Sequence, residues 1–483
     1  MRSAIPKDVK MSLKVMVNKE KTKVPFAEAN SKSAEVILSF LMLPLGEIVR
    51  VFEEHYLDKK PVVGSLTPMY RHLTTLRSDY FWTDGGKNML LNPSNSFMSG
   101  PVKHFRCGDM DCKKKSFRNV SIYYDSGTCD CGKPLNRAMG EIEPKPQAGG
   151  DGILVEGLHF LVTDDLQLAP YEPGSMMETL VYLGIVVTEG AEQLNVTLGY
   201  NEIVDLLKRS LLSKTPLTDV ILCVINKNMG YVLEDILLDK IELESTSSKR
   251  MTVTALMQKS TNKLLFVKGR EDFVDFILSF LTIPLGGVVS LLRGKTCFKG
   301  IDNLYKSTSN LIKDKHFITG DAKRRLQEPQ LPPYYVSKNQ IFSLSEQIVN
   351  SIYYYESITD SSDQTIGKGS WMRYKDPKGD QGCYVKPGMF KISDDLTFLK
   401  CFFSNSAILS KLKIPPSDVK EMEVQIGLKE GLSILKAALR STTALADGLV
   451  KHITKASVAS NSAQSDGLHN KTSNKRPKTK VSP

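Results

Sequence analysis

The sequence predicts an α+β fold in which one module of about 200 residues occurs twice in tandem. Of the 483 residues, 41% are hydrophobic and 24% are charged, as in ordinary globular proteins, which excludes fibrous, collagenous and wholly disordered classes. Apolar residues recur with strand-like and helix-like periods, without a regular alternation of strand and helix. The same order of segments then occurs again, and only the first copy carries a cysteine cluster.

The repeat is clearest near the start of each copy. Residues 15–52 align with 255–292 without a gap, and the pentapeptide 37–41 recurs unchanged as 277–281. Further on, FLVTDDL corresponds to FKISDDL. We therefore expect a first module at 1–245 with a Cys-rich insert at about 100–140, a polar linker at 244–249, a second module at 249–450 and a disordered basic tail at 451–483.

Each module is expected to open with a β-hairpin. Apolar residues at every second position, on both sides of a polar turn, are typical of two antiparallel strands. The first copy shows this pattern at Leu13, Val15, Val17, the turn 20–22, Val24 and Phe26, and the second at Val253, Ala255, Met257, the turn 260–262, Leu264 and Phe266.

Helices are expected next, because residues 33–40 and 272–280 are largely apolar over more than two turns. Pro44 and Pro284 then indicate the first turn of a further helix, where a missing N–H costs nothing.

The end of each module predicts two more strands and a helix. One strand ends at an Asp-Asp pair, and another is expected at 194–198 and at 422–426. A closing amphipathic helix follows at 203–211, with Leu206, Leu207 and Leu211 on one face.

These segments resemble a known family. The motifs are L-K-V-M-V-N-K with V-P-F-A-E-A, the repeated I-L-S-F-L-x-x-P-L-G, and V-T-L-G-Y-N-E-I-V-D-L-L-K-R-S-L-L-S-K-T-P-L-T-D. Together they are similar to the plant proteins grouped as domain of unknown function 674, over about residues 11–450 and in both copies. The resemblance implies a plant origin and tandem modules, and it implies no activity, ligand or catalytic residue.

Membrane insertion and secretion are not expected. Residues 276–292 carry no charge, but Pro284, Gly286 and Gly287 interrupt them, which favours a buried helix, a turn and a second helix. The first residues are polar and contain no secretory signal, so eight cysteines indicate a reducing compartment, the cytoplasm or the nucleus. The net charge is +11, and much of it lies in the tail.

The cysteine cluster predicts a structural zinc site in a zinc-ribbon-like loop. Zinc takes four soft ligands in a tetrahedron, and two ligand pairs on adjacent turns supply them. The one-residue spacing of the second pair departs from the usual C-x-x-C, and free thiols or a redox role are the alternatives. His104 is a possible substitute ligand, although a surface histidine is the simpler interpretation. The four predicted ligands are Cys107, Cys112, Cys129 and Cys131.

The two Asp-Asp pairs have two interpretations. Neighbouring carboxylates can hold a divalent cation or act in acid–base chemistry. Successive residues of a strand point to opposite faces, however, and Asp at a strand end commonly makes a turn or a cap. The pairs are Asp164-Asp165 and Asp394-Asp395.

No established catalytic or nucleotide-binding motif occurs in the chain, so the function stays unknown and a non-enzymatic interaction protein is the leading hypothesis. Its partner is expected in the groove between the two copies, which would pack as a pseudo-symmetric pair. One alternative is nucleic-acid binding through the basic zinc loop and tail. The other is a metal-dependent enzyme that uses the Asp pairs. The basic stretches are 113–115 with Arg118, Tyr123 and Tyr124, and 475–480.

Overall fold

The computed structural model describes most of the chain, and several expected segments lie wholly or largely outside the part described. Nothing is described for most of the expected linker, for the tail, or for the basic stretches 113–115 and 475–480. The described residues are 5–93, 104–109, 112, 118–139, 152–186, 189–226, 249–348, 352–359, 365–401, 409–410 and 412–449.

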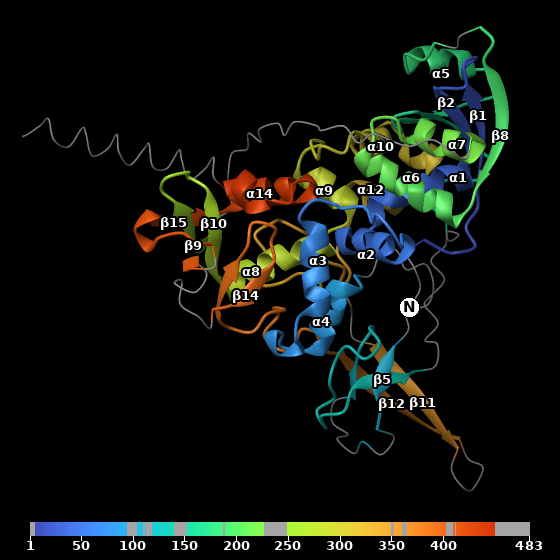
Figure 1. The fold of residues 1–483 in the computed structure, drawn as a ribbon. Helices are drawn as coiled ribbons and strands as arrows, with labels where there is room; N and C mark the ends of the chain where they lie inside the picture. The colour runs from blue at the N-terminus through green and yellow to red at the C-terminus, as the bar shows by residue number, and fades with distance from the viewer. Residues whose placement is uncertain are drawn as a thin grey trace, which may run out of the picture.

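Two five-stranded antiparallel sheets organise the molecule, and both have the same strand order (Figure 1). The first sheet has the order β7-β6-β2-β1-β8 and the second the order β14-β13-β10-β9-β15. The strands are β1 (Met11–Val17), β2 (Phe26–Asn30), β6 (His159–Thr163), β7 (Leu168–Tyr171), β8 (Glu192–Leu198), β9 (Met251–Gln258), β10 (Leu264–Arg270), β13 (Met389–Ile392), β14 (Phe398–Lys400) and β15 (Val419–Ile426).

The apolar residues at every second position form the buried face of each hairpin. In β1 the apolar positions Met11, Leu13, Val15 and Val17 are buried, while the residues between them are exposed or half-buried. Leu13 pairs with Ala29 of β2 on one side and with Val196 of β8 on the other. The predicted hairpins are therefore present as β1–β2 and β9–β10.

Thirteen helices lie in the described ranges, and they include those predicted from apolar periodicity. α1 begins two residues earlier than expected because the Asn30 side chain accepts a hydrogen bond from the N–H of Ser33 at 2.8 Å. The helices are α1 (Ser31–Ser39), α2 (Leu45–His55), α3 (Leu66–Thr75), α4 (Asp84–Leu91), α5 (Met176–Tyr182), α6 (Tyr200–Leu212), α7 (Pro216–Asn226), α8 (Glu271–Leu278), α9 (Leu285–Leu291), α10 (Lys299–Asn310), α11 (Lys313–His316), α12 (Gly320–Gln327) and α14 (Leu428–Arg440).

The two repeated prolines meet at the centre of the molecule. Each caps the helix that follows it, one position earlier than expected, and Pro44 and Pro284 form an antiparallel bridge with each other. The N–H of Leu45 donates to the carbonyl of Ile283 at 3.0 Å, and the N–H of Leu285 donates to the carbonyl of Leu43 at 2.9 Å. The two halves of the chain therefore contact each other through equivalent segments.

Each half also places helices on the sheet of the other half. In α3, His72 Nε2 lies 2.6 Å from the carbonyl oxygen of Phe398 in β14. In α10, the hydroxyl of Ser307 accepts a hydrogen bond from the N–H of Leu168 in β7 at 2.9 Å. Figure 1 shows α3 and α4 beside α8 and β14, and α10 beside α6. The edge strands β7 and β14 are thus each contacted by a helix from the opposite half.

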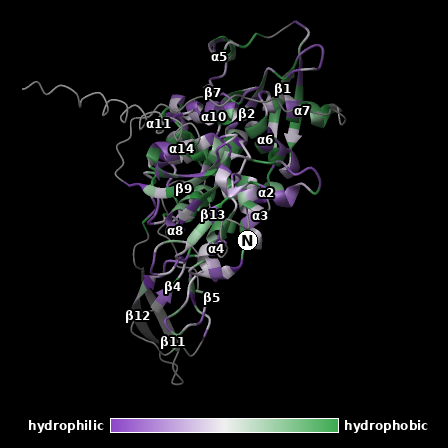
Figure 2. Cartoon of the chain, turned by 60° about the vertical axis from the view of Figure 1, so that its left-hand side comes forward, coloured by the Kyte–Doolittle hydropathy of each residue, from purple (hydrophilic) through white to green (hydrophobic). Residues whose placement is uncertain are grey.

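One apolar core joins the two halves, and its cluster of buried residues runs from Ile5 to Leu449. These residues lie in the body of the molecule (Figure 2). The uncharged stretch 276–292 is part of this core, divided into the end of α8, a 3₁₀ turn (Ser279–Thr282) and α9. None of the helices in the described ranges has both the length and the apolarity to cross a lipid bilayer.

Candidate metal centre

The four predicted cysteines come together in space. Their sulfur atoms all lie within 4.8 Å of one another, and no described cysteine forms a disulfide. Cys107 Sγ lies 3.4 Å from Cys131 Sγ, and Cys112 Sγ lies 3.7 Å from Cys129 Sγ. A tetrahedron with metal–sulfur bonds of about 2.3 Å has sulfur–sulfur edges of about 3.8 Å, so one ion fits this set.

A short two-stranded sheet brings the two cysteine pairs together. β3 (Phe105–Cys107) ends at the first cysteine, and it pairs with β5 (Leu135–Ala138). The second pair lies in the tight turn before β5. In this turn the N–H of Cys129 donates to the carbonyl of Lys133 at 2.8 Å, and the N–H of Gly132 donates to the carbonyl of Cys129 at 2.8 Å.

Glycine makes this turn possible despite the unusual C-x-C spacing. Gly132 has a φ of +83°, a left-handed conformation that costs glycine little. Because the chain reverses directly after Cys131, both sulfurs of the second pair reach the first pair. The single intervening residue therefore does not prevent convergence of the four thiols.

Burial and backbone hydrogen bonding shift the pKa values of the thiols in opposite directions. The backbone N–H of Lys133 lowers the pKa of Cys131 to about 7, whereas burial raises the pKa of Cys107 to about 12 and also raises the pKa of Cys129. A bound divalent cation would hold all four as thiolates, since metal binding displaces thiol protons. Four sulfur ligands fill a tetrahedral shell, so such a site has no open position for a substrate.

His104 is not a surface residue, and that interpretation is wrong. It is buried, and its Nε2 lies 2.8 Å from the hydroxyl of Tyr374. It does not belong to the group of cysteine ligands. Its burial follows from a long-range contact with a strand of the second half, which the local sequence does not reveal.

The cysteine-bearing segment is joined to the second half of the chain. β4 (Arg118–Val120) pairs in parallel with the end of β12 (Thr365–Tyr374), which pairs in turn with β11 (Ile352–Thr359). The hydroxyl of Tyr123 donates to the carbonyl of Pro333 at 2.9 Å. Asp130, between the two cysteines of the turn, forms an ion pair with Lys375 at 3.2 Å.

The Asp-Asp pairs serve as caps and turns. Asp164 accepts hydrogen bonds from the backbone N–H and the hydroxyl of Thr218, both at 2.8 Å, near the start of α7. Asp394 accepts from the N–H of Ala446 at 2.7 Å in the equivalent position. Within the part of the chain that the structure describes, the four cysteines form the one group of three or more potential metal ligands.

The second Asp of each pair closes a local turn. Asp165 accepts a hydrogen bond from the hydroxyl of Thr163, and Asp395 accepts one from the hydroxyl of Thr397, each at 2.7 Å. Asp165 also pairs with Lys299 at 3.0 Å. The interpretation of the Asp pairs as turns or caps agrees with the contacts of all four carboxylates.

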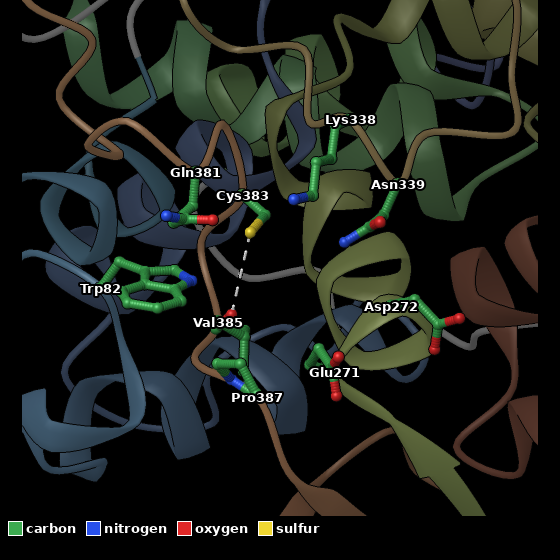
Figure 3. A pocket seen from close by; sticks show the side chains of 9 residues that line it. All are labelled: Trp82, Glu271, Asp272, Lys338, Asn339, Gln381, Cys383, Val385 and Pro387. Atoms are coloured by element: carbon green, nitrogen blue, oxygen red, sulfur yellow. Dashed lines mark hydrogen bonds between the residues drawn. The ribbon is translucent and has the colours of Figure 1, made fainter.

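A small cavity of about 100 Å³ lies at the start of α8 (Figure 3). Two of its polar side chains are engaged in the fold: Glu271 accepts from the N–H of Gly388 at 3.1 Å, and the Asn339 side chain donates to Asp275 at 3.3 Å. This space is smaller than ordinary ligand pockets of about 300 Å³ or more. Sequence reasoning did not single out its lining, which is Trp82, Glu271, Asp272, Lys338, Asn339, Gln381, Cys383, Val385 and Pro387.

The fold and the site define an α+β protein of two five-stranded sheets with a four-cysteine cluster that can hold a metal ion. The family described as "Protein of unknown function (DUF674)" matches residues 7–429, and the chain belongs to this family. No curated protein and no solved structure matches the chain.

Proposed function

We propose that this protein is a non-enzymatic interaction protein of the plant cytoplasm or nucleus, stabilised by one structural zinc ion on Cys107, Cys112, Cys129 and Cys131. The observation that carries the proposal is the convergence of the four thiols of residues 107–131 within 4.8 Å of one another. Zinc suits an all-sulfur tetrahedral set, and iron is the other metal that such a set accepts. Two cysteine pairs beside a short antiparallel sheet support a zinc-ribbon-like loop.

A duplicated module is the second part of the proposal. Equal strand order in the two sheets supports it, and so do the equivalent positions of Pro44 with Pro284 and of Asp164 with Asp394. Two modules that exchange helices are the single-chain analogue of a symmetric dimer. In this arrangement the zinc loop of the first module would fasten it to β12 of the second.

Exposed apolar side chains on α5 support a role in binding another protein. Met177, Val181 and Tyr182 are 67%, 76% and 73% exposed, and Val186 just beyond the helix is 81% exposed. Apolar groups gathered on one surface commonly mark a protein interface. The centre between the halves is a less suitable place, since Leu41, Leu45, Leu281 and Leu285 are buried there.

The zinc proposal is tested by metal analysis of the purified full chain. We expect elemental mass spectrometry to find one zinc ion per chain in the wild type and none in the double variant C129S/C131S. The matched control is Cys401→Ser, a half-buried cysteine outside the cluster, which should keep its zinc. Iron in place of zinc would show as visible absorbance. Absence of any metal, or equal loss in both variants, would contradict the proposal.

The interaction proposal is tested at α5. Val181→Glu with Tyr182→Glu should abolish capture of specific partners from a plant extract, as measured by quantitative mass spectrometry against the wild type. Leu412→Glu, which changes an exposed apolar residue of the second half, is the control and should leave capture unchanged. Equal capture by all three proteins would exclude α5 as the partner surface.

Nucleic-acid binding is a second candidate, favoured by one observation. Trp371 is 67% exposed on β12 and Arg373 is exposed two residues later on the same strand face. An aromatic ring beside a cation suits a single-stranded nucleic acid. A salt-dependent titration of labelled single strands would test this: affinity that falls steeply with salt and is lost in Trp371→Ala would support it.

A further inference from the structure

The sulfurs of the candidate metal centre form two separate contact pairs. Cys107 lies 3.4 Å from Cys131, and Cys112 lies 3.7 Å from Cys129, measured between sulfur atoms. A disulfide bond requires about 2.05 Å, so each pair needs to close by roughly 1.5 Å. The pairs share no atom, and both bonds can therefore form in the same molecule. Of the three possible ways to join four cysteines, the contacts favour this one.

The four cysteines differ in solvent exposure, and this difference suits stepwise oxidation. Cys107 is buried, whereas Cys112 and Cys131 are half-buried. An oxidant from solvent can therefore reach at least one sulfur of each pair. The partner sulfur lies in contact and can complete the disulfide before further oxidation of the first.

We propose that the four-cysteine centre is a reversible oxidation site in which Cys107 bonds to Cys131 and Cys112 bonds to Cys129, with release of the metal. This inference rests on the proposed zinc centre and adds its regulation. The oxidant is a hydroperoxide. One thiolate of each pair takes the terminal oxygen to form a sulfenic acid and an alcohol, or water when the oxidant is hydrogen peroxide. The second thiolate of the pair then displaces that oxygen as water.

Oxidation of the zinc-bound centre to two disulfides is balanced in atoms and electrons. Four thiolates lose four electrons and form two disulfides, while two hydroperoxides accept these electrons and four protons from solvent. Two molecules of alcohol and two of water leave, and the zinc ion departs because a disulfide sulfur is no longer a thiolate ligand. Thiol reductant and zinc restore the starting state.

The rest of the fold would respond through the turn that holds the second pair. Asp130 lies between Cys129 and Cys131 and pairs with Lys375, next to the end of β12. A movement of either sulfur by the closure distance displaces the backbone on both sides of Asp130. Oxidation is therefore expected to alter the junction between the cysteine-bearing segment and the second half.

The experiment uses the zinc-loaded full chain and graded hydrogen peroxide. Zinc release is followed with a chromogenic chelator, and the disulfides are mapped after digestion with an endoproteinase that cleaves before aspartate. Cleavage before Asp109, Asp111 and Asp130 separates the two cysteines of each sequence pair, so that the connectivity is read directly. We expect two equivalents of peroxide to release one zinc and to link Cys107 with Cys131 and Cys112 with Cys129.

The controls separate this inference from the zinc proposal. Cys112→Ser should retain only the Cys107–Cys131 disulfide, and Cys401→Ser should behave as the wild type. Sulfinic acids in place of disulfides, another connectivity, or zinc that stays bound after two equivalents would each overturn the inference. A chain that never binds zinc would instead overturn the proposed function. Its disulfide map would still test whether Cys107 bonds to Cys131 and Cys112 to Cys129.

Discussion

Pro44 and Pro284 pair with each other in an antiparallel bridge at the centre of the molecule. Each caps the equivalent helix of its own half, and the residues after them approach each other closely. A Cβ atom added to Gly286 would lie 2.9 Å from the carbonyl oxygen of Leu326 and 3.0 Å from that of Leu41. Glycine at this position is therefore a requirement of the contact between the halves.

Replacement of Gly286 by alanine should destabilise the protein by about 1–3 kcal/mol, because the added methyl group meets backbone that cannot easily move. The measurement is urea unfolding. Gly287→Ala is the matched control in the same helix, since its Cβ would find its nearest neighbour at an ordinary 3.4 Å. We expect that control to be neutral or stabilising by up to about 1 kcal/mol. Equal effects of both substitutions would contradict the close contact.

Asp164→Ala should lower the free energy of unfolding by about 1–3 kcal/mol. The substitution removes the acceptor of two hydrogen bonds from Thr218 and leaves a buried N–H at the start of α7 without its cap. Asp164→Asn keeps an acceptor oxygen and should recover part of the loss. Metal content should be the same in both variants, and a drop in bound metal would instead revive the metal-binding interpretation of the Asp pairs.

Asp275 should make the stability depend on pH. Burial raises the pKa of this carboxyl, although it accepts hydrogen bonds from the N–H groups of Tyr384 and Val385. Above the unfolded pKa of about 4 and below the raised folded pKa, the folded state holds a proton that the unfolded state has lost. The contribution of Asp275 to stability is therefore present at low pH and is lost as the pH rises through the folded pKa.

Urea unfolding between about pH 4.5 and 7.5 checks the sign of this effect. The stability of the wild type should fall relative to that of Asp275→Asn as the pH increases. Asp58→Asn, which removes an exposed carboxyl, is the control for loss of a charge at the surface. A wild type that gains stability relative to Asp275→Asn on raising the pH would refute the assignment.

Removal of the metal should loosen the cysteine-bearing segment before the rest of the molecule. A strong chelator is expected to increase proteolytic cleavage within residues 104–139, because loss of the metal would free the cysteine-bearing turn from β3. The two five-stranded sheets should persist, as measured by hydrogen exchange of β1 and β9. Unchanged cleavage in 104–139 after complete removal of the metal would contradict a structural role for it.

A chain cut between its halves should stay together. A protease site inserted at 244–248 and then cleaved is expected to give two fragments that elute as one particle. The reason is that α3 contacts β14, α10 contacts β7, and the core contains residues of both halves. Separation of the fragments in size-exclusion chromatography without denaturant would show that this exchange of helices is not what holds the halves together.

Local periodicity was enough to predict the hairpins, the helices after them and the strands that end at the Asp pairs. The burial of Leu13, Val15 and Val17 on one face is a property of the strand itself, so the sequence reveals it. The four cysteines were also predicted, because their residue type and clustering are visible in the chain. Capping of α7 by Asp164 was among the stated interpretations, but its partner Thr218 was not.

The features that the sequence did not reveal all depend on contacts between distant residues. The exchange of α3 and α10 and the burial of His104 against Tyr374 arise only when the two halves pack. Two acidic side chains were also missed: Glu35 accepts the N–H groups of Ile153 and Leu154, as Asp275 does for Tyr384 and Val385.

The sequence by itself determined the hairpin of each half, the apolar helices that follow it, the strands near the Asp pairs, and which four thiols can act together. These properties depend on residue order over a few turns of chain. Only the tertiary structure decided which helix covers which sheet edge and that the cysteine-bearing segment joins the second half. Such choices depend on the shapes of whole surfaces, which form only after the elements have folded and packed.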